Sequence, residues 1–364
     1  MNESARELTV ELGERSYPIW VGADCSSDVL FPLIRSKKVL LVADTNTAEL
    51  YGSRSLEILK QAPCEVALSV FPAGEQSKHL ATVERICRDA VRAGLDRSSV
   101  FIALGGGVCG DMTGLAAALY MRGTRFIQIP TTLLAMVDSS VGGKTGVDLP
   151  EGKNLIGAFF QPMAVLINPL LLQTLPQRQL SNGFAEMVKT AMILDGALFE
   201  RLETSAAELY TLSGNAPVSE VIARCCELKA EVVSGDEKES GRRAVLNYGH
   251  TFGHALEAAT GYRTFEHGEA VAVGMCMAAD LALAEGLITA AEVQRQEDLL
   301  KAFHLPVSAE NLGLTPEKLL RAMQHDKKTS GGRIRIVLPV RIGHAEVFGN
   351  ISSDRLEEAL CGRI

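Results

Sequence analysis

The sequence has few of the features that mark membrane, nucleic-acid-binding or secreted proteins. Its longest apolar run, residues 270–279, ends at Asp280 and is too short to cross a bilayer. The formal net charge of −8 leaves no basic footprint for nucleic acid. None of the 8 cysteines forms a Cys-x-x-Cys pair, which favours reduced thiols in a cytosolic protein. The polar residues 1–10 lack the apolar core of a signal peptide, so we expect a cytoplasmic protein.

The sequence also shows no internal repeat and no low-complexity tract. Aromatic residues make up 5%, charged residues 22% and hydrophobic residues 47% of the 364 positions, which is typical of a soluble globular protein. A chain of this length has enough apolar residues for two domains.

The first half of the chain alternates short apolar runs with helical segments. Residues 7–12 and 17–21 flank a turn and predict a β-hairpin. Strands follow at 37–44, 65–71, 100–104, 126–129 and 163–168, with helices at 48–60, from 78 to 93 and at 112–119. This alternation predicts a mostly parallel sheet with helices on both faces.

Beyond residue 178 the pattern becomes helical. Apolar spacing predicts helices at 180–194, 198–212, 218–233, 251–260, 269–285 and 291–303, with extended segments at 333–339 and 345–348. We therefore predict an α/β domain over residues 1–178 and a helical domain over residues 179–364.

A glycine turn joins the predicted strand 100–104 to the helix after it. Gly105, Gly107 and Gly110 satisfy Gly-x-Gly-x-x-Gly, and such a turn lets backbone N–H groups approach a phosphate at a helix N-terminus. The pattern alone is weak, because glycine turns close many strand–helix units for steric reasons.

Two further features are compatible with a nucleotide or another anion. Asp44 ends the strand 37–44, where an acid accepts hydrogen bonds from a ribose in dinucleotide folds, but it precedes the glycine turn instead of following it, and a plain loop acid is the alternative. Gly143-Lys144-Thr145 resembles the end of a P-loop, although Asp138 occupies the position of the first glycine and excludes that motif. Lys144, Lys153 and Asn154 remain as donors on glycine-rich loops and indicate an anion site.

The helical half contains residue types that bind metals. His250 and His254 are four residues apart and share a helix face, and His267 opens the next helix. Glu186 lies in the middle of an apolar helix, where a carboxylate is costly unless it is paired or metal-bound. Two histidines and one glutamate suit Zn²⁺ or a similar ion, whereas capping or hydrogen-bonded core histidines are the alternative for any one of them. Spacing alone does not separate His250 from His254.

Taken together, the motifs resemble the 3-dehydroquinate synthase family over residues 44–328. The resemblance is carried by Pro72-x-Gly-Glu-x-x-Lys78, Gly105-Gly-Gly-x-x-Gly-Asp111, Arg122-Gly123, Pro130-Thr-Thr132, Val137-Asp-Ser-Ser-Val-Gly-Gly-Lys-Thr145, Gly152-Lys-Asn154, Ala185-Glu-x-x-Lys189, Glu227-Leu-Lys229, Asn247-x-Gly-His-x-x-Gly-His254 and His267-Gly-Glu269. Ten motifs in order are far more specific than any one of them.

The resemblance implies a Rossmann-like NAD-binding α/β domain, an all-α metal- and substrate-binding domain, and an active site in the cleft between them. It implies a cytoplasmic homodimer of the shikimate pathway that converts 3-deoxy-D-arabino-heptulosonate 7-phosphate to 3-dehydroquinate and phosphate. It also implies NAD⁺ that is reduced and reoxidised in each turnover, and a divalent metal, Zn²⁺ or Co²⁺.

The resemblance also implies roles for individual residues. The metal ligands would be Glu186, His250 and His267. The residues that hold NAD would be Asp44, Ala73, Gly74, Glu75, Gln76, Ser77, Lys78, Gly106, Gly107, Val108, Cys109, Gly110, Asp111, Thr131, Thr132, Lys144, Lys153, Leu171, Leu172, Gln173 and Thr174. Catalytic or substrate contacts would come from Arg122, Asp138, Lys144, Lys153, Asn154, Lys189, Lys229, Arg243, Asn247, His254, Lys327 and Lys328.

Three alternatives remain. A related sugar-phosphate cyclase, such as a valiolone-type or aminodehydroquinate synthase, would share the metal ligands and the glycine turn. A metal-dependent glycerol or alcohol dehydrogenase would share the layout but would not need so many anion-binding lysines. A binding protein without turnover would leave Asp138, Lys144 and His254 unexplained.

Overall fold

The computed structural model describes residues 5–22, 26–35, 37–213, 215–239, 241–310, 312–327 and 335–364. The chain divides into two compact units. One contains Met1–Leu175 and Lys229–Lys238, and the other contains Pro176–Leu228 and Glu239–Ile364. The main segment of the first unit ends at Leu175, and the short segment Lys229–Lys238 joins it. The expected domain boundary after residue 178 stays a prediction. We describe each unit by itself.

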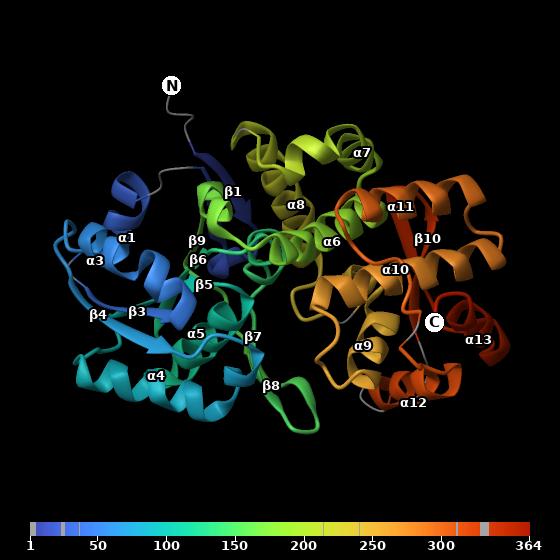
Figure 1. Cartoon of the computed structure of the whole chain (residues 1–364). Helices are drawn as coiled ribbons and strands as arrows, with labels where there is room; N and C mark the ends of the chain where they lie inside the picture. Colours follow the sequence, from blue (N-terminus) through green and yellow to red (C-terminus); the bar gives the residue numbers. More distant parts are fainter. Residues whose placement is uncertain are drawn as a thin grey trace. The chain divides into compact units, whose positions relative to one another are not determined.

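The first unit is built on a seven-stranded sheet with the order β1-β2-β9-β6-β5-β3-β4 (Figure 1). β1 pairs with β2 in antiparallel fashion, as the predicted hairpin requires, and the remaining pairs are parallel. The strands are β1 (Arg6–Val10), β2 (Tyr17–Val21), β3 (Lys38–Asp44), β4 (Glu65–Phe71), β5 (Val100–Gly105), β6 (Arg125–Pro130) and β9 (Ala164–Ile167).

Helices cover both faces of this sheet, which confirms the predicted α/β class. Leu40 and Val42 of β3 point into a core with α4 and α5, whereas Val39 and Leu41 point into a second core with α1 and α3. This two-sided burial explains why β3 is a continuous apolar run. The helices are α1 (Phe31–Ile34), α2 (Thr45–Thr47), α3 (Ser53–Leu59), α4 (Leu80–Arg92) and α5 (Gly107–Leu119).

Two predicted helices have different limits in the structure. The helix expected over 48–60 is broken into α2, a π-helical turn (Ala48–Gly52) and α3. The helix expected from residue 112 begins at Gly107, with Gly106 as its N-cap. Because glycine is unfavourable inside helices, the sequence pattern did not predict the first turn of α5, which contains Gly107 and Gly110.

The segment that supplies Lys144, Lys153 and Asn154 is a β-hairpin, so the expectation of glycine-rich loops was wrong. β7 (Lys144–Leu149) and β8 (Gly152–Phe159) pair in antiparallel fashion. A Cβ at Gly157 would lie 2.2 Å from the carbonyl oxygen of Thr145, so close strand pairing explains this glycine.

The second unit is mainly helical, as predicted, and contains one two-stranded hairpin. Its elements are α6 (Gln177–Leu194), α7 (Gly196–Tyr210), most of α8 (Asn215–Gly235), α9 (His250–Ala259), α10 (His267–Ala284), α11 (Ala290–Ala302), α12 (Pro316–Lys327), β10 (Ile336–Arg341), β11 (His344–Phe348) and α13 (Ser353–Cys361). The sequence did not predict α12 and α13.

Helix α10 is the central helix of the second unit. In the part of the chain that the structure describes, it is the one helix long and apolar enough to cross a membrane, and 72% of that window is buried inside the protein. It contacts α6, α9, α11, α13 and β10, so its apolar surface lies in a protein core.

Two glycines allow α10 to approach its neighbours closely. A Cβ at Gly268 would lie 2.2 Å from the carbonyl oxygen of Asn182 on α6. A Cβ at Gly274 would lie 2.1 Å from the carbonyl oxygen of Gly249, directly before α9. Because no side chain separates the backbones there, the middle of α6, which carries Glu186, and the first turns of α9 and α10, which carry His250 and His267, converge.

Candidate functional site

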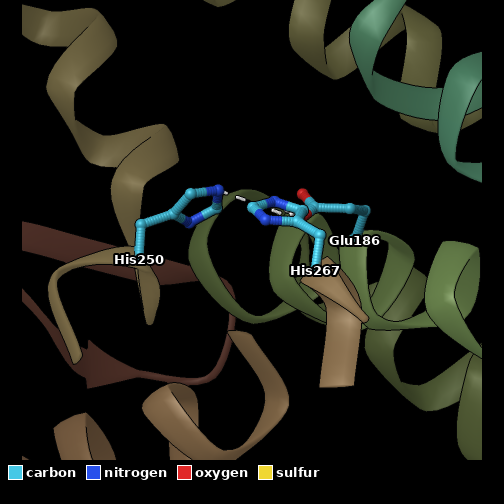
Figure 2. A group of neighbouring side chains, drawn as sticks. All are labelled: Glu186, His250 and His267. Atoms are coloured by element: carbon cyan, nitrogen blue, oxygen red, sulfur yellow. Dashed lines mark ion pairs between the residues drawn. The ribbon is translucent and has the colours of Figure 1, made fainter. Parts of the chain in front are cut away.

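Three side chains from α6, α9 and α10 form a cluster with the donor atoms of a metal site. The Nε2 atoms of His250 and His267 lie 3.8 and 3.6 Å from Oε1 of Glu186, which is 1% exposed. One ligand atom from each residue lies within 4.8 Å of the others. Figure 2 shows both imidazole rings turned toward the carboxylate. Two imidazole nitrogens and one carboxylate oxygen suit Zn²⁺ or Co²⁺ and leave coordination positions for water or substrate.

Each histidine of the cluster has an acceptor beside its other ring nitrogen. Nδ1 of His250 lies 3.1 Å from the carbonyl oxygen of Tyr248. Nδ1 of His267 lies 3.7 Å from Oε2 of Glu257, a residue of α9 that is 2% exposed. An acceptor at Nδ1 leaves Nε2 as the nitrogen that binds a metal.

The two histidines titrate in opposite directions. Burial, reinforced by the nearby Lys189 ammonium, lowers the pKa of His250 to about 3, so its ring is neutral at pH 7. Burial also acts to lower the pKa of His267, but the carboxylates of Glu186 and Glu257 outweigh burial and raise it to about 9. A metal bound at this cluster must therefore displace a proton from His267.

The structure separates His254 from His250, which the spacing left open. His254 is exposed and belongs to a second group with Glu257 and His267, not to the group around Glu186. Its ring centroid lies 5.4 Å from that of His250. Its position beside the cluster fits the role in proton handling that the resemblance implies.

Other candidates of the second unit surround the cluster or lie near it in the chain. Lys189, 2% exposed, forms a close ion pair with Glu186 one turn away on α6. Asn247 donates from Nδ2 to Oε1 of Glu239 at 3.0 Å. Arg243 is 2% exposed whereas Arg242 is exposed, so burial distinguishes the two arginines.

In the first unit, the predicted cofactor residues gather at one edge of the sheet. Parallel strands end at the same edge, and Asp44, the 73–78 turn, the 106–111 turn and Thr131–Thr132 follow β3, β4, β5 and β6 respectively. Leu171–Thr174 lie in the 3₁₀ helix after β9. This edge is where open α/β sheets bind ligands.

Asp44 and Gly105 lie where the strand order reverses. The chain leaves β3 for β4 on one side and returns to β5 on the other side of β3. Asp44 Oδ2 lies 3.4 Å from the position that a Cβ at Gly105 would occupy, and Cys109 Cβ lies 2.6 Å from it, so only glycine fits there. Asp44 also accepts hydrogen bonds from N and Oγ1 of Thr47, so it caps α2 as well.

Lys78 connects this edge to the β7–β8 hairpin. Its Nζ lies 2.7 Å from Oδ2 of Asp111 and donates to Oδ1 of Asn154 at 2.6 Å. Its carbonyl oxygen accepts from N of Asp148, and Oδ1 of Asp148 accepts from N of Asn154 at 2.7 Å. Asn154 has a left-handed φ of 57°, so side-chain and backbone contacts together hold it in that conformation.

Three lysines of the first unit lie near acids or on the hairpin. Lys153 Nζ is 3.8 Å from Oε1 of Glu75, and Lys144 begins β7. Lys229, which belongs to the first unit although α8 begins in the second, lies 2.7 Å from Oδ1 of Asp138. A strand follows Gly143-Lys144-Thr145 where a P-loop would require a helix, which confirms that the motif is not a P-loop.

Three predicted contact residues are not placed beside the metal cluster or the carboxyl edge of the sheet. Arg122 lies three residues before β6 begins, at the opposite edge of the sheet from Thr131, in a turn where its φ is 66°. Lys328 lies outside the described residues, and Lys327 is placed only as the last residue of α12.

The sequence analysis missed three residues that support the site. Glu257 lies seven positions after His250 and three after His254, so its helical spacing was a usable signal. The Asp148 carboxylate accepts from the backbone N of Asn154, and the backbone carbonyl group of Tyr248 faces His250, and the sequence gives no signal for either contact.

Comparison with known proteins gives two family matches that cover most of the chain. Residues 68–182 match the model of the 3-dehydroquinate synthase N-terminal domain, and residues 183–329 match the model of the C-terminal domain. Glu186, His250 and His267 all lie in the second matched segment.

One curated relative and two solved structures of other cyclases are similar to this chain at different levels of sequence identity. The chain is 47% identical over 355 residues to a 3-dehydroquinate synthase of a Picosynechococcus species, covering 96% of this chain and 97% of the relative. A 2-epi-5-epi-valiolone synthase from Streptomyces hygroscopicus with NAD⁺ and Zn²⁺ bound superposes with a TM-score of 0.90 at 33% identity, covering 97% and 98% of the two chains. A 2-deoxy-scyllo-inosose synthase complexed with carbaglucose-6-phosphate, NAD⁺ and Co²⁺ gives a TM-score of 0.85 at 26% identity, covering 99% and 100%.

Proposed function

The chain belongs to the 3-dehydroquinate synthase family, and on this premise we propose that it converts 3-deoxy-D-arabino-heptulosonate 7-phosphate to 3-dehydroquinate and phosphate. The observation that carries the proposal is the cluster of Glu186, His250 and His267 inside a chain that matches both family domains in order. The enzyme would be a carbon–oxygen lyase of aromatic amino acid biosynthesis, cytoplasmic and homodimeric.

The second unit would hold a divalent metal. The donor set fits, because His250 is neutral, Glu186 is buried as a paired carboxylate, and both Nε2 atoms face it. Zn²⁺ and Co²⁺ are the metals named for the two cyclase structures above. A bound divalent ion supplies a Lewis acid that polarises hydroxyl and ketone oxygens of the substrate.

The first unit would hold NAD at the carboxyl edge of its sheet. The glycine turn exposes the N-terminus of α5 to a pyrophosphate, and Asp44 at the switch point would accept hydrogen bonds from a ribose. Bound NAD⁺ accepts a hydride from the substrate and later returns it. Thr131, Thr132 and the 171–174 segment would line the same edge.

The charged residues of both units would bind the substrate anion and move its protons. Lys144, Lys153, Lys229 and Arg243 carry positive charge that suits a carboxylate and a phosphate. Lys189 beside Glu186 and His254 beside His267 would hold or transfer protons next to the metal cluster. Asp138, Asn154 and Asn247 would orient the hydroxyl groups, and Arg122, Lys327 and Lys328 stay as predicted contacts.

The other cyclases define the second candidate function. The TM-score of 0.90 with a valiolone synthase supports a shared fold, whereas identity is 47% to a dehydroquinate synthase and 33% to that cyclase. The higher identity over the full length favours the carboxylated heptulosonate as substrate.

One assay tests the proposal. The purified chain is supplied with the heptulosonate phosphate, Zn²⁺ or Co²⁺, and NAD⁺ far below the substrate concentration. We expect phosphate and dehydroquinate to appear in equal amounts and many times in excess of NAD⁺, with no net NADH. Turnover of a sugar phosphate without a carboxylate would identify a related cyclase, stoichiometric NADH from a simple polyol would identify a dehydrogenase, and no turnover with any of them would contradict the proposal.

A further inference from the structure

Glu257 is a buried carboxylate for which the reaction proposed above has no role. It lies on α9 on the helix face shared with His250 and His254, and its side chain is 2% exposed. A carboxylate is costly to bury unless a cation or a hydrogen-bond donor compensates it. Its Oε2 lies 3.7 Å from Nδ1 of His267, so the imidazole of a candidate metal ligand faces it.

In both histidines of the cluster Nδ1 faces an oxygen acceptor, but the acceptor is a backbone carbonyl group for His250 and a side-chain carboxylate for His267. His250 directs Nε2 toward Glu186 and presents Nδ1 to the carbonyl oxygen of Tyr248. His267 directs Nε2 toward the same oxygen of Glu186 and presents Nδ1 to Glu257. In both cases an acceptor at Nδ1 determines which nitrogen points into the cluster.

The need for such an acceptor is greater at His267. Each histidine is the first residue of its helix, but the His267 side chain is 32% exposed, against 13% for His250. A more exposed ring has fewer packing contacts to determine its rotation. A carboxylate that faces Nδ1 as an ion-pair partner supplies the missing constraint.

From this geometry we propose that Glu257 is a positioning residue, which holds the His267 ring through Nδ1 and so aims Nε2 at the metal. The inference rests on the proposed function in taking Glu186, His250 and His267 as the metal ligands. Loss of the carboxylate leaves the three ligands in place but lets one of them rotate.

The alternative is that Glu257 is itself a metal ligand. His254, Glu257 and His267 form a second group whose ligand atoms lie within 4.8 Å of one another. Glu257 faces the nitrogen of His267 that points away from Glu186, so a metal there would be a second ion, separate from the first. Metal stoichiometry therefore distinguishes the two roles.

The experiment compares Glu257→Gln, which keeps the shape of the side chain, with Glu257→Asp, Glu257→Ala and the control Glu208→Gln. Glu208 is an exposed glutamate of α7. For each variant, Zn²⁺ affinity is measured by competition with a chromogenic chelator. The visible absorption of the Co²⁺ form and the Tm of the metal-free protein are recorded alongside.

We expect wild type to bind one metal per chain and Glu257→Ala, which removes the acceptor, to bind it about 10- to 100-fold more weakly, with a changed Co²⁺ spectrum. Glu257→Gln keeps a neutral amide oxygen that can accept from Nδ1, so its affinity should fall between those of Glu257→Ala and wild type. The metal-free Tm of Glu257→Gln should stay near that of wild type, Glu257→Asp should recover part of the affinity, and Glu208→Gln should match wild type. A merely structural role would lower the metal-free Tm and leave the spectrum unchanged.

Two results would overturn the inference: unchanged affinity and spectrum in Glu257→Ala, or two metals in wild type and one in the variant. If Glu257→Ala does not fold, Glu257→Leu, which fills more of the space and also removes the acceptor, takes its place. Absence of phosphate release by wild type, together with weaker metal binding in the variant, would refute the proposed reaction and leave the role of Glu257 standing.

Discussion

Individual side chains of the metal cluster show how burial divides roles among similar residues. His250 and His254 have equivalent spacing in the sequence, and only the position of the Glu186 carboxylate distinguishes them. Arg242 and Arg243 are adjacent, and only Arg243 is buried. Sequence reasoning therefore proposed the residue types but could not distinguish neighbouring residues of the same type. Which side of a helix faces the core depends on what packs against it.

Removal of one ligand should abolish metal binding and activity together. We expect His250→Ala to lower Zn²⁺ affinity at least about 100-fold, because two remaining donors do not make a zinc site. Metal content after dialysis and phosphate release are the two measurements. His344→Ala serves as the control, since His344 lies on β11 with its side chain 49% exposed. Activity that survives without bound metal would contradict the ligand assignment.

The raised pKa of His267 predicts that metal affinity depends on pH. With a pKa of about 9 in the folded protein against an ordinary 6.5, His267 is protonated at neutral pH before metal binds. Protonation therefore stabilises the metal-free fold fully below pH 6.5, and this contribution disappears as pH rises through about 9.

Zn²⁺ affinity should accordingly rise by about tenfold per pH unit from pH 7 toward pH 9, because one proton is released for each metal bound. Chelator competition across this range measures the slope, and calorimetry in buffers of different ionisation enthalpy counts the proton. A flat profile would mean that His267 is already neutral.

At the scale of elements, the β7–β8 hairpin was the main error of prediction. It contains Gly146, Gly152 and Gly157 and follows Gly142 and Gly143, and such glycines are typical of loops. The strands form because glycine permits their backbones to pair closely. This pairing depends on the partner strand, so the local sequence does not predict it. The helix predicted at α5 was too short for a related reason, because the first turn of α5 contains Gly107 and Gly110.

Lys78 ties three elements of the first unit together, so its loss should loosen the hairpin. Lys78→Met leaves the partly buried Asp111 carboxylate without the ammonium group and removes the contact to Asn154. We expect the unfolding free energy of this unit to fall by roughly 3 kcal/mol, as for other broken buried pairs.

Urea unfolding measures that loss, and hydrogen exchange of β8 amides reports the hairpin. Lys301→Met is the matched control, because Lys301 forms an exposed pair with Glu297 within one helix, where we expect less than about 1 kcal/mol. Equal effects of the two substitutions would show that the buried network contributes little.

At the scale of the whole molecule, the two ligand groups belong to different units. The predicted NAD residues lie in the first unit, and the metal cluster lies in the second. Segment 229–238 returns to the first unit and brings Lys229 to Asp138, an arrangement that the linear domain boundary did not predict. The expectation of an active site in a cleft between the domains stays a prediction.

Each ligand should therefore stabilise its own unit. Removal of the metal with a chelator should speed hydrogen exchange around Glu186 of α6 and in the first turns of α9 and α10. Added NAD⁺ should slow hydrogen exchange around residues 105–119. A ligand at 100 times its Kd stabilises the state that binds it by about 2.7 kcal/mol, which is enough to change exchange rates measurably. Unchanged exchange in the second unit after metal removal, or around residues 105–119 after NAD⁺ addition, would contradict the assignment.

Local pattern in the chain was enough to predict the fold class and most of the strands and helices, and to propose the residue types of the site, because apolar periodicity and ordered motifs are local properties. The tertiary structure alone decided which histidine faces Glu186, that Glu257 lies behind His267, and that the glycine-rich segment pairs as strands. These outcomes depend on contacts between residues far apart in sequence, and a contact has no energy until the fold brings its two partners within reach.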